Sequence, residues 1–243
     1  MPTAWLNESD SGSVRPSIAK AIADNPILSN VRPATRQRLA QFAVFQEVER
    51  GEPVCMQDAL ANRFWLTVRG EVKLLKYTTR GAALLIDIIL PNQLFGTVFY
   101  ERNQVYPYTA EAMKRTALLS LPLQDLLDEL EANPPLQRAL LRDTCEKLAH
   151  ANQMRGLSLE QARVRVAHQL LLLSEKFGPV IPQTRAVLAE LAGTTVETAI
   201  RISNAMARDG VIVTRRGQIK VLCHASLRAY AEGRERVEAC AGS

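Results

Sequence analysis

The spacing of apolar residues divides the chain into a helical start, a long β-prone stretch and a helical remainder. Near the N-terminus, helices are expected over Ile18–Ile27 and Pro33–Phe42. From Ala43 to Leu121 the apolar residues fall into short runs separated by turn residues such as Arg50-Gly51 and Arg69-Gly70. Strands are expected over residues 45–48, 63–68, 72–77, 83–90, 108–113 and 116–121. Short strands at this spacing predict a small barrel or jelly roll.

The apolar positions return to helical spacing after Pro122. Helices are expected over residues 123–130, 136–155 and 159–177. Along the second of these helices a seam recurs at spacings of three, four and three, formed by Leu141, Thr144, Leu148 and Ala151. This seam is typical of a coiled coil and predicts a dimerisation helix. Because the seam is short, a helix that packs only on its own barrel is the alternative.

Gly156 is expected to interrupt the long helix. We therefore place a domain boundary there, between residues 1–156 and residues 157–243.

The C-terminal part contains two helices joined by a tight turn. The first is expected over Thr184–Leu191, and Gly193 supplies the turn. The second is expected over Thr195–Arg208, with Thr194 or Thr195 as its N-cap. One face of the second helix is apolar and carries Ala199, Ile202 and Met206. The opposite face is polar and carries Glu197, Arg201, Asn204 and Arg208.

A β-hairpin is expected directly after these helices. Apolar runs at Val211–Val213 and Ile219–Leu222 flank Arg215-Arg216, which places two arginines at the hairpin tip. Two helices with a tight turn, followed by a basic hairpin, predict a winged helix-turn-helix that binds DNA. An ordinary two-helix corner followed by a hairpin is the alternative.

Composition agrees with two soluble domains and a nucleic-acid partner. The 243 residues are 47% hydrophobic and carry a net charge of +5. From Ser158 onward there are 12 Lys and Arg against 8 Asp and Glu, an excess of four positive charges. A solvated basic surface is the alternative to phosphate contact. The chain has no apolar run long enough for a membrane span and no secretory leader pattern, so we expect a cytoplasmic protein without a membrane partner.

The sequence offers no parts for catalysis or metal binding. The four cysteines, at positions 55, 145, 223 and 240, are widely spaced and predict neither a disulfide framework nor a zinc site. We find no nucleophile–base group and no phosphate-binding glycine loop, and we therefore expect no enzyme activity.

Several segments, taken together, resemble a known family. In the β-prone stretch these are Arg50-Gly51-Glu52-Pro53, Arg69-Gly70-Glu71-Val72, Leu90-Pro91-Asn92-Gln93-Leu94-Phe95-Gly96 and Thr109-Ala110. The segment Thr195-Val196-Glu197-Thr198-Ala199-Ile200-Arg201 is similar to a recognition-helix signature. From about Ile18 onward, the chain resembles the bacterial regulators typified by the cyclic-AMP receptor protein and the fumarate-nitrate regulator.

This resemblance implies an α+β fold with an N-terminal β-roll (jelly-roll) sensor domain, a long dimerisation helix and a C-terminal winged helix-turn-helix. It implies double-stranded DNA and a second copy of the chain as partners, with RNA polymerase as a third if the regulator activates transcription. The residues expected to contact DNA are Thr194, Thr195, Val196, Glu197, Ile200, Arg201, Asn204, Arg215 and Arg216. In the fumarate-nitrate branch Glu197 and Arg201 fall on residues that read bases, and a serine stands at the place of Ile200.

The sensor departs from both branches of the family. In the cyclic-AMP branch a glutamate follows the barrel glycine and an arginine-serine pair meets the cyclic phosphate. Here Thr97 follows Gly96, and Tyr108-Thr109 replaces the pair. A neutral phenol cannot neutralise a phosphate, so we do not expect cyclic AMP to be the effector.

Iron-based cofactors are not expected either. An iron–sulfur cluster needs about four thiolates, and the sensor offers only Cys55. All three histidines lie after the barrel, which leaves no histidine there to ligate haem. We expect Cys55 to be a small core residue, with a redox role as the alternative.

A candidate effector pocket is nevertheless defined by the few aromatic residues of the sensor. Its expected members are Trp65, Gly96, Thr97, Tyr100, Arg102, Tyr106, Tyr108 and Thr109. These side chains could hold an aromatic or anionic metabolite, or they could fill a barrel that needs no ligand; the sequence leaves both open. The function expected is that of a homodimeric, sequence-specific transcription regulator on an inverted-repeat DNA site. A ligand-binding module without a direct DNA function is the alternative.

Overall fold

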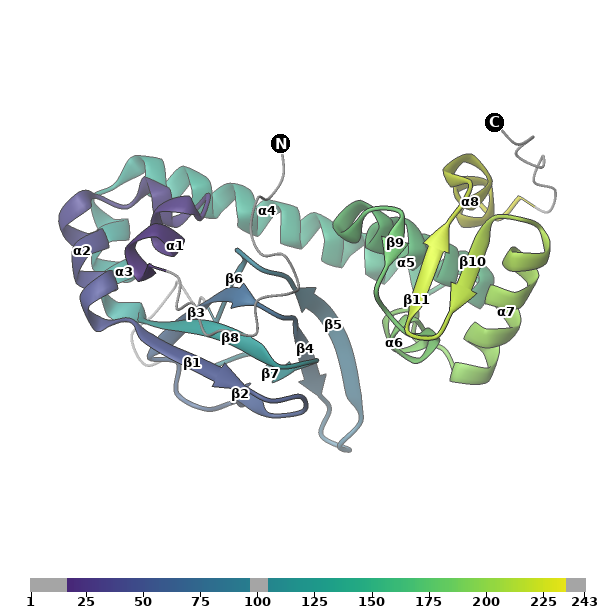
Figure 1. Ribbon diagram of the computed structural model, residues 1–243, viewed down its shortest axis with the longest axis horizontal. Helices are drawn as coiled ribbons and strands as arrows, with labels where there is room; N and C mark the ends of the chain where they lie inside the picture. Colours follow the sequence, from purple (N-terminus) through teal and green to yellow (C-terminus); the bar gives the residue numbers. More distant parts are fainter. Residues whose placement is uncertain (1–16, 97–104, 235–243) are drawn as a thin grey trace. The chain divides into compact units, whose positions relative to one another are not determined.

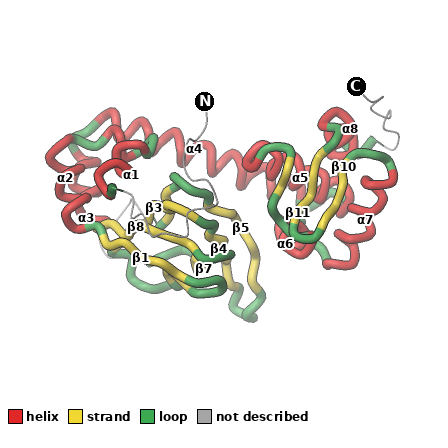
Figure 2. Tube along the Cα trace, in the orientation of Figure 1, coloured by secondary structure: helices red, strands yellow, loops and turns green. Residues whose placement is uncertain are grey.

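The computed structural model describes residues 17–96 and 105–234. Three expected members of the effector pocket, Thr97, Tyr100 and Arg102, lie outside the described residues. The chain forms two compact units, Met1–Leu74 with Ile88–Asp143 and Leu75–Asp87 with Thr144–Ser243. Figure 2 distinguishes the strand-rich region from the more helical C-terminal region.

The N-terminal region contains two antiparallel sheets (Figure 1). The strands are β1 (Val44–Val48), β2 (Pro53–Cys55), β3 (Arg63–Arg69), β4 (Val72–Tyr77), β5 (Ala83–Ile89), β6 (Leu94–Phe95), β7 (Thr109–Ala112) and β8 (Thr116–Pro122). The first sheet has the order β1-β8-β3-β6 and the second β2-β7-β4-β5. The six strands expected from sequence are confirmed, whereas β2 and β6 are too short to show a period in the sequence.

Strands β3 and β8 of the first sheet are buried on both faces because their side chains alternate between two cores. On β3, Phe64 and Leu66 belong to a cluster with the helices, whereas Trp65 belongs to the cluster between the sheets. On β8, Leu119 and Leu121 join the helical side and Leu118 joins the other. The antiparallel register places Trp65 opposite Ser120 and Leu66 opposite Leu119 across β3 and β8.

Short helices cover the outer face of the first sheet. They are α1 (Ile18–Asp24), the 3-10 turn η1 (Leu28–Asn30), α2 (Pro33–Phe42) and α3 (Leu123–Glu131). Figure 1 shows α1, α2 and α3 gathered at one end of the strands. The expected first helix is shorter than predicted, because the extended backbone of Asn25 ends it directly before Pro26.

A buried carboxylate joins α2 to α3. Glu129 is only 1% exposed. It accepts hydrogen bonds from Arg32 N at 3.0 Å, Arg32 Nε at 2.8 Å, Thr35 Oγ1 at 2.6 Å and Asn133 Nδ2 at 2.6 Å. Burial alone would raise the pKa of Glu129, but these donors outweigh it and lower the pKa to about 2. The carboxylate therefore stays ionised inside the fold.

The long helix α4 spans Pro134–Leu157, and the expected interruption at Gly156 is wrong. Gly156 sits in the last turn of the helix, where the cost of glycine, about 1 kcal/mol against alanine, is tolerated. The turn follows instead at Ser158, whose N–H bonds Met154 O. Leu159 is 90% exposed, and α5 (Ala162–Phe177) begins three residues later than expected.

The C-terminal region after α5 consists of β9 (Val180–Ile181), α6 (Arg185–Leu191), α7 (Val196–Arg208), β10 (Ile212–Arg215), β11 (Gln218–Val221) and α8 (His224–Ala231). The three strands form one antiparallel sheet with the order β10-β11-β9. Its core includes Leu170 of α5, Leu188 of α6 and Met206 of α7, all fully buried. Sequence reasoning missed β9 and α8, which are too short to show a clear period.

Among the described residues, Cys55 and Cys145 are free, and Cys223 is the N-cap of α8.

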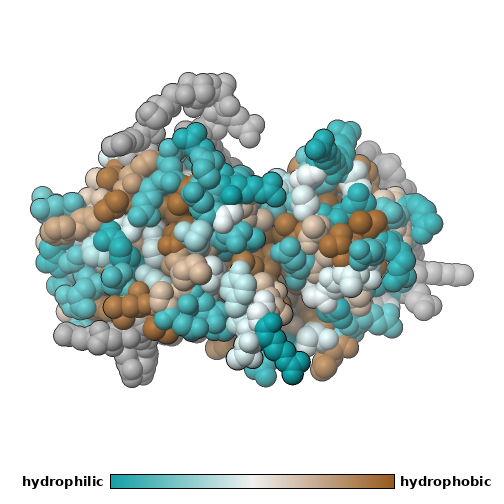
Figure 3. Space-filling view, turned by 90° about the horizontal axis from the view of Figure 1, so that it is seen from below, coloured by the Kyte–Doolittle hydropathy of each residue, from teal (hydrophilic) through white to brown (hydrophobic). Residues whose placement is uncertain are grey.

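None of the described helices combines the length and the apolar composition needed to cross a bilayer. On the face shown in Figure 3, hydrophobic residues are interspersed with hydrophilic ones.

Candidate nucleic-acid interface

Each helix of the pair α6–α7 begins at a threonine N-cap. Thr184 Oγ1 accepts a hydrogen bond from Val187 N at 3.3 Å and starts α6. Thr195 Oγ1 accepts from Thr198 N at 3.2 Å and starts α7, so the N-cap is Thr195 rather than Thr194. Between the helices, Gly193 has φ of 57°, a conformation that residues with a Cβ rarely adopt.

The turn between these helices is held by an arginine that sequence reasoning missed. From α5, Arg165 donates to Ala192 O at 2.7 Å, Gly193 O at 3.0 Å and Glu160 O at 2.6 Å. Carbonyl groups at the end of a helix lack partners within the helix, and a guanidinium satisfies them well. Nothing local in the sequence marks this role, because the carbonyls lie 27 and 28 residues after Arg165.

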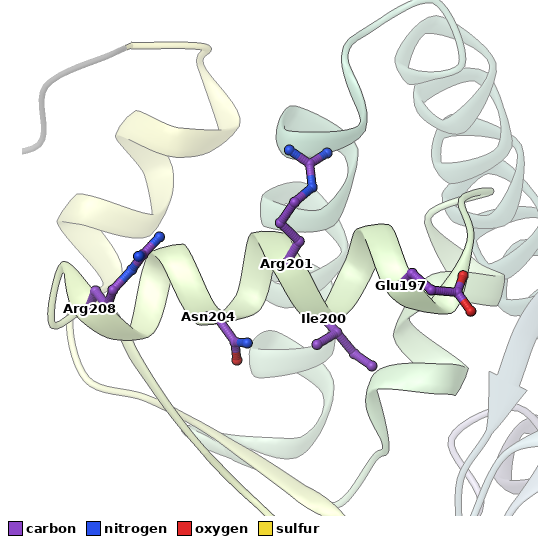
Figure 4. A pocket seen from close by; sticks show the side chains of 5 residues that line it. All are labelled: Glu197, Ile200, Arg201, Asn204 and Arg208. Atoms are coloured by element: carbon purple, nitrogen blue, oxygen red, sulfur yellow. The ribbon is translucent and has the colours of Figure 1, made fainter.

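The two faces of α7 are separated as predicted. Ala199, Ile202 and Met206 are buried. Glu197, Arg201, Asn204 and Arg208 are exposed, and Ile200 is half-buried. The four polar residues and Ile200 together line an open concavity of about 600 Å³. Figure 4 shows Arg201 and Arg208 projecting from one side of α7, and Ile200 and Asn204 from the other.

The hairpin β10–β11 presents the other basic side chains. Arg215 pairs with Gln218 in the register, so Arg216 and Gly217 form the two-residue loop. Gly217 has φ of 75°, which suits a tight hairpin turn. Arg215 and Arg216 are both exposed. Of the remaining expected DNA-contacting residues, Val196 and Thr195 are exposed and Thr194 is half-buried.

In the sensor, the described aromatic residues of the candidate pocket pack against one another. Trp65 stacks on Phe95 with ring centroids 5.4 Å apart, and Tyr106 lies 5.4 Å from the Trp65 ring at a tilt of 47°. The Tyr106 hydroxyl donates to Arg63 O at 2.7 Å. Burial raises the pKa of Tyr106, so the phenol is neutral at physiological pH. These described side chains pack against one another, and Trp65 Nε1 is buried without a hydrogen-bond partner among the described residues.

The polar pocket residues are engaged by backbone groups. Gly96 N donates to the Tyr108 hydroxyl at 2.7 Å, and Gln57 N donates to Thr109 Oγ1 at 3.0 Å. Gly96 has φ of 76°, and a Cβ there would stand 2.6 Å from the Trp65 ring, so the position requires glycine.

Cys55 belongs to the same core. It is buried, and burial raises the pKa of its thiol to about 11. Because the thiolate is the reactive form, this thiol is poorly suited to redox sensing at neutral pH.

The predicted dimer seam lies on the exposed side of α4. Leu141 is 63% exposed and Leu148 is 59% exposed, and Ala151 is also exposed. Leu140, one residue before the seam, is buried in the helical core of the sensor. The fourth member, Thr144, is exposed as well. The seam is therefore separate from the side of α4 that packs within its own chain.

Comparison with known proteins agrees with this geometry. Residues 45–133 match the cyclic nucleotide-binding domain family, and residues 164–230 match the Crp-like helix-turn-helix domain family. The cyclic AMP receptor protein of Thermus thermophilus is 31% identical over 186 residues, covering 76% of this chain and 86% of that protein. The chain belongs to the family of CRP/FNR transcription regulators.

Other members of the CRP/FNR family show the same likeness. The transcriptional activator protein FnrA of Stutzerimonas stutzeri is 26% identical over 196 residues, covering 76% of this chain and 80% of that protein. The structure of FixK2 from Bradyrhizobium japonicum matches with a TM-score of 0.70 at 22% identity, covering 77% of this chain and 96% of FixK2. The predicted family, the α+β fold class and the role as a DNA-binding transcription regulator are thereby confirmed.

Proposed function

We propose that this CRP/FNR regulator binds an inverted-repeat DNA site as a homodimer. In this proposal residues 1–156 form the sensor barrel and dimerisation helix, and residues 157–243 form the DNA-binding domain. One observation carries it: the outer face of α7 holds Glu197, Arg201 and Asn204 opposite a buried apolar face, and an arginine-tipped hairpin follows.

Each side chain of this face has a base or phosphate that suits its chemistry. An exposed arginine mid-helix matches guanine O6 and N7, so Arg201 is assigned to a guanine. A carboxylate accepts from cytosine N4, which suits Glu197 in the first turn. Arg215 and Arg216, at the hairpin, are assigned to phosphates because they extend from a loop rather than from the reading face. Thr194, Thr195 and Val196 border the same helix end.

A dimer formed through α4 would require an inverted-repeat site. Two large apolar side chains exposed on one helix, Leu141 and Leu148, favour a second copy of α4 as their partner. A twofold axis would present two α7 helices to successive major grooves about 34 Å apart. RNA polymerase is a further partner if the protein activates transcription from the promoter that carries its site.

Selection from a random duplex library tests this function directly. We expect enrichment of an inverted repeat whose half-sites lie about 10–10.5 base pairs apart. Selections with and without cell extract show whether an effector is needed. Recovery of no preferred sequence under either condition would contradict the proposal and favour a ligand-binding module without a DNA function.

Replacement of Ile200 by serine is expected to change specificity without changing the fold. At 100° per residue, Ile200 lies about 60° from Glu197 on the helical wheel, at the border of the reading face. An apolar side chain there fits the thymine methyl, the apolar group of the major groove. Replacing that thymine by uracil should weaken wild-type binding roughly two- to fourfold and spare Ile200→Ser. Equal weakening of both proteins, or early melting of the variant, would make Ile200 a core residue.

Cyclic AMP is expected to have no effect on this protein. The Tyr108 hydroxyl accepts from Gly96 N and carries no charge with which to neutralise a cyclic phosphate. A ligand at 100 times its dissociation constant would add about 2.7 kcal/mol of stability. Thermal melting and DNA affinity at millimolar cyclic AMP measure this, with AMP as the control. A rise in melting temperature specific to the cyclic form would refute the prediction and leave the DNA-binding proposal intact.

A further inference from the structure

Arg185 reaches from α6 to the reading face of α7. It is the first residue of α6, and its Nη1 donates to Asn204 Oδ1 at 3.3 Å. Asn204 lines the same concavity as Glu197 and Arg201. The residue pair was not anticipated from sequence, because Arg185 and Asn204 are 19 residues apart and belong to different helices.

This contact fixes which way the Asn204 amide points. A guanidinium has only donors, so the atom of Asn204 that meets Arg185 must be the carbonyl oxygen. The amide NH₂ group, with two donors, is then the part left for another partner. The assignment does not depend on seeing hydrogen atoms, since the chemistry of arginine allows one orientation.

The orientation has a consequence for base recognition. Asparagine reads adenine with both amide atoms, accepting from N6 and donating to N7. In this protein Arg185 occupies one of the two lone pairs of the Asn204 oxygen. An adenine amino group that donated to the other lone pair would lie beside the positive charge of the guanidinium, which disfavours adenine. Guanine O6 and N7 and thymine O4 present only acceptors in the major groove. Those edges match the NH₂ group.

We propose that Arg185 directs the Asn204 amide so that its NH₂ group, rather than its oxygen, reads the base, which favours guanine or thymine over adenine at one half-site position. Arg185 is thus a positioning residue for specificity, acting through Asn204. The inference rests on the proposed function, in which α7 enters the major groove. Asn204 lies seven residues after Glu197, almost in line with it and about 10.5 Å along the helix, so it addresses a different base step.

The test is a binding series on the selected site with each base in turn at the position that Asn204 reads. That position is found with Asn204→Ala, which should bind all four bases there within about twofold. Wild type should prefer guanine or thymine to adenine by roughly tenfold, and Arg185→Ala should reduce this preference to about threefold or less. Arg185→Lys keeps a cationic donor and should retain most of the preference. In Asn204→Ala, adding Arg185→Ala should leave the base preference unchanged.

Each other outcome has a stated meaning. If Arg185→Ala weakens all four duplexes equally and keeps the wild-type preference, Arg185 is only a phosphate contact and the inference is overturned. An adenine preference in the wild type, or an Asn204→Ala variant with no effect at any position, also overturns it. If the wild type selects no sequence at all, the proposed function fails and this inference fails with it. If the wild type does select a site but Arg185→Ala keeps the base preference, only this inference fails.

Discussion

Arg201→Ala is expected to lower affinity for the selected site by about 1–3 kcal/mol for each half-site, while binding to random DNA changes little. Arg201 is exposed mid-face on α7 and lines the concavity of Figure 4. A guanidinium that donates two parallel hydrogen bonds to guanine O6 and N7 loses both when truncated to a methyl group. Each step of about 1.4 kcal/mol corresponds to a tenfold change in the dissociation constant. Titration of a labelled duplex at fixed salt, with a scrambled duplex of equal length, measures both affinities.

The two hairpin arginines provide the matched control. Arg215→Ala and Arg216→Ala each remove one proposed phosphate contact per subunit, which makes two per dimer, so they should weaken binding to selected and scrambled duplexes alike. The slope of log affinity against log salt should fall by about 0.9 for each lost contact, and therefore by about 1.8 for each variant dimer. If Arg201→Ala instead weakens both duplexes equally and flattens the salt slope in the same way, Arg201 contacts phosphate and does not read a base.

The reading helix was predictable because its information is local. Thr195 caps α7 within its own first turn, and the buried set of Ala199, Ile202 and Met206 follows the helical period. The hairpin was predictable for the same reason, since Gly217 follows the loop arginine between two β-prone runs. Patterns that repeat within one element depend little on the rest of the chain, so they can be predicted from the sequence.

Polar contacts between distant segments were not predictable. Arg165 gives no local sign that it will hold the turn of the helix pair, and Arg185 gives none that it will orient Asn204. Glu129 reads as one more acidic residue of an amphipathic helix, yet it is buried against Arg32 and Thr35, which lie 97 and 94 residues earlier. Gly156 led to a wrong prediction of a helix break, because a long helix tolerates one glycine in its last turn.

Glu129→Gln is expected to destabilise the sensor by about 3 kcal/mol at neutral pH. Its carboxylate receives bonds from the backbone and side-chain nitrogens of Arg32, from Thr35 and from Asn133, and it is shielded from water. These bonds lower its pKa from 4.5 to about 2. Glutamine keeps the shape but removes the charge that the donors stabilise, and its NH₂ group would face them.

The pH dependence distinguishes this charge effect from lost packing. Because the folded pKa lies below the unfolded one, the contribution is fully present above about pH 4.5 and is lost as pH falls toward 2. The stability difference between wild type and Glu129→Gln should therefore shrink by more than half from about pH 7 to about pH 3.

Urea unfolding followed by Trp65 fluorescence, in a Trp5→Phe background, reports on the sensor core, in which Trp65 is buried. Glu131→Gln, at an exposed position of the same helix, should change stability by no more than about 0.5 kcal/mol. A difference for Glu129→Gln that stays constant across this pH range would show that the loss comes from packing and that the buried carboxylate contributes no net stability through its charge.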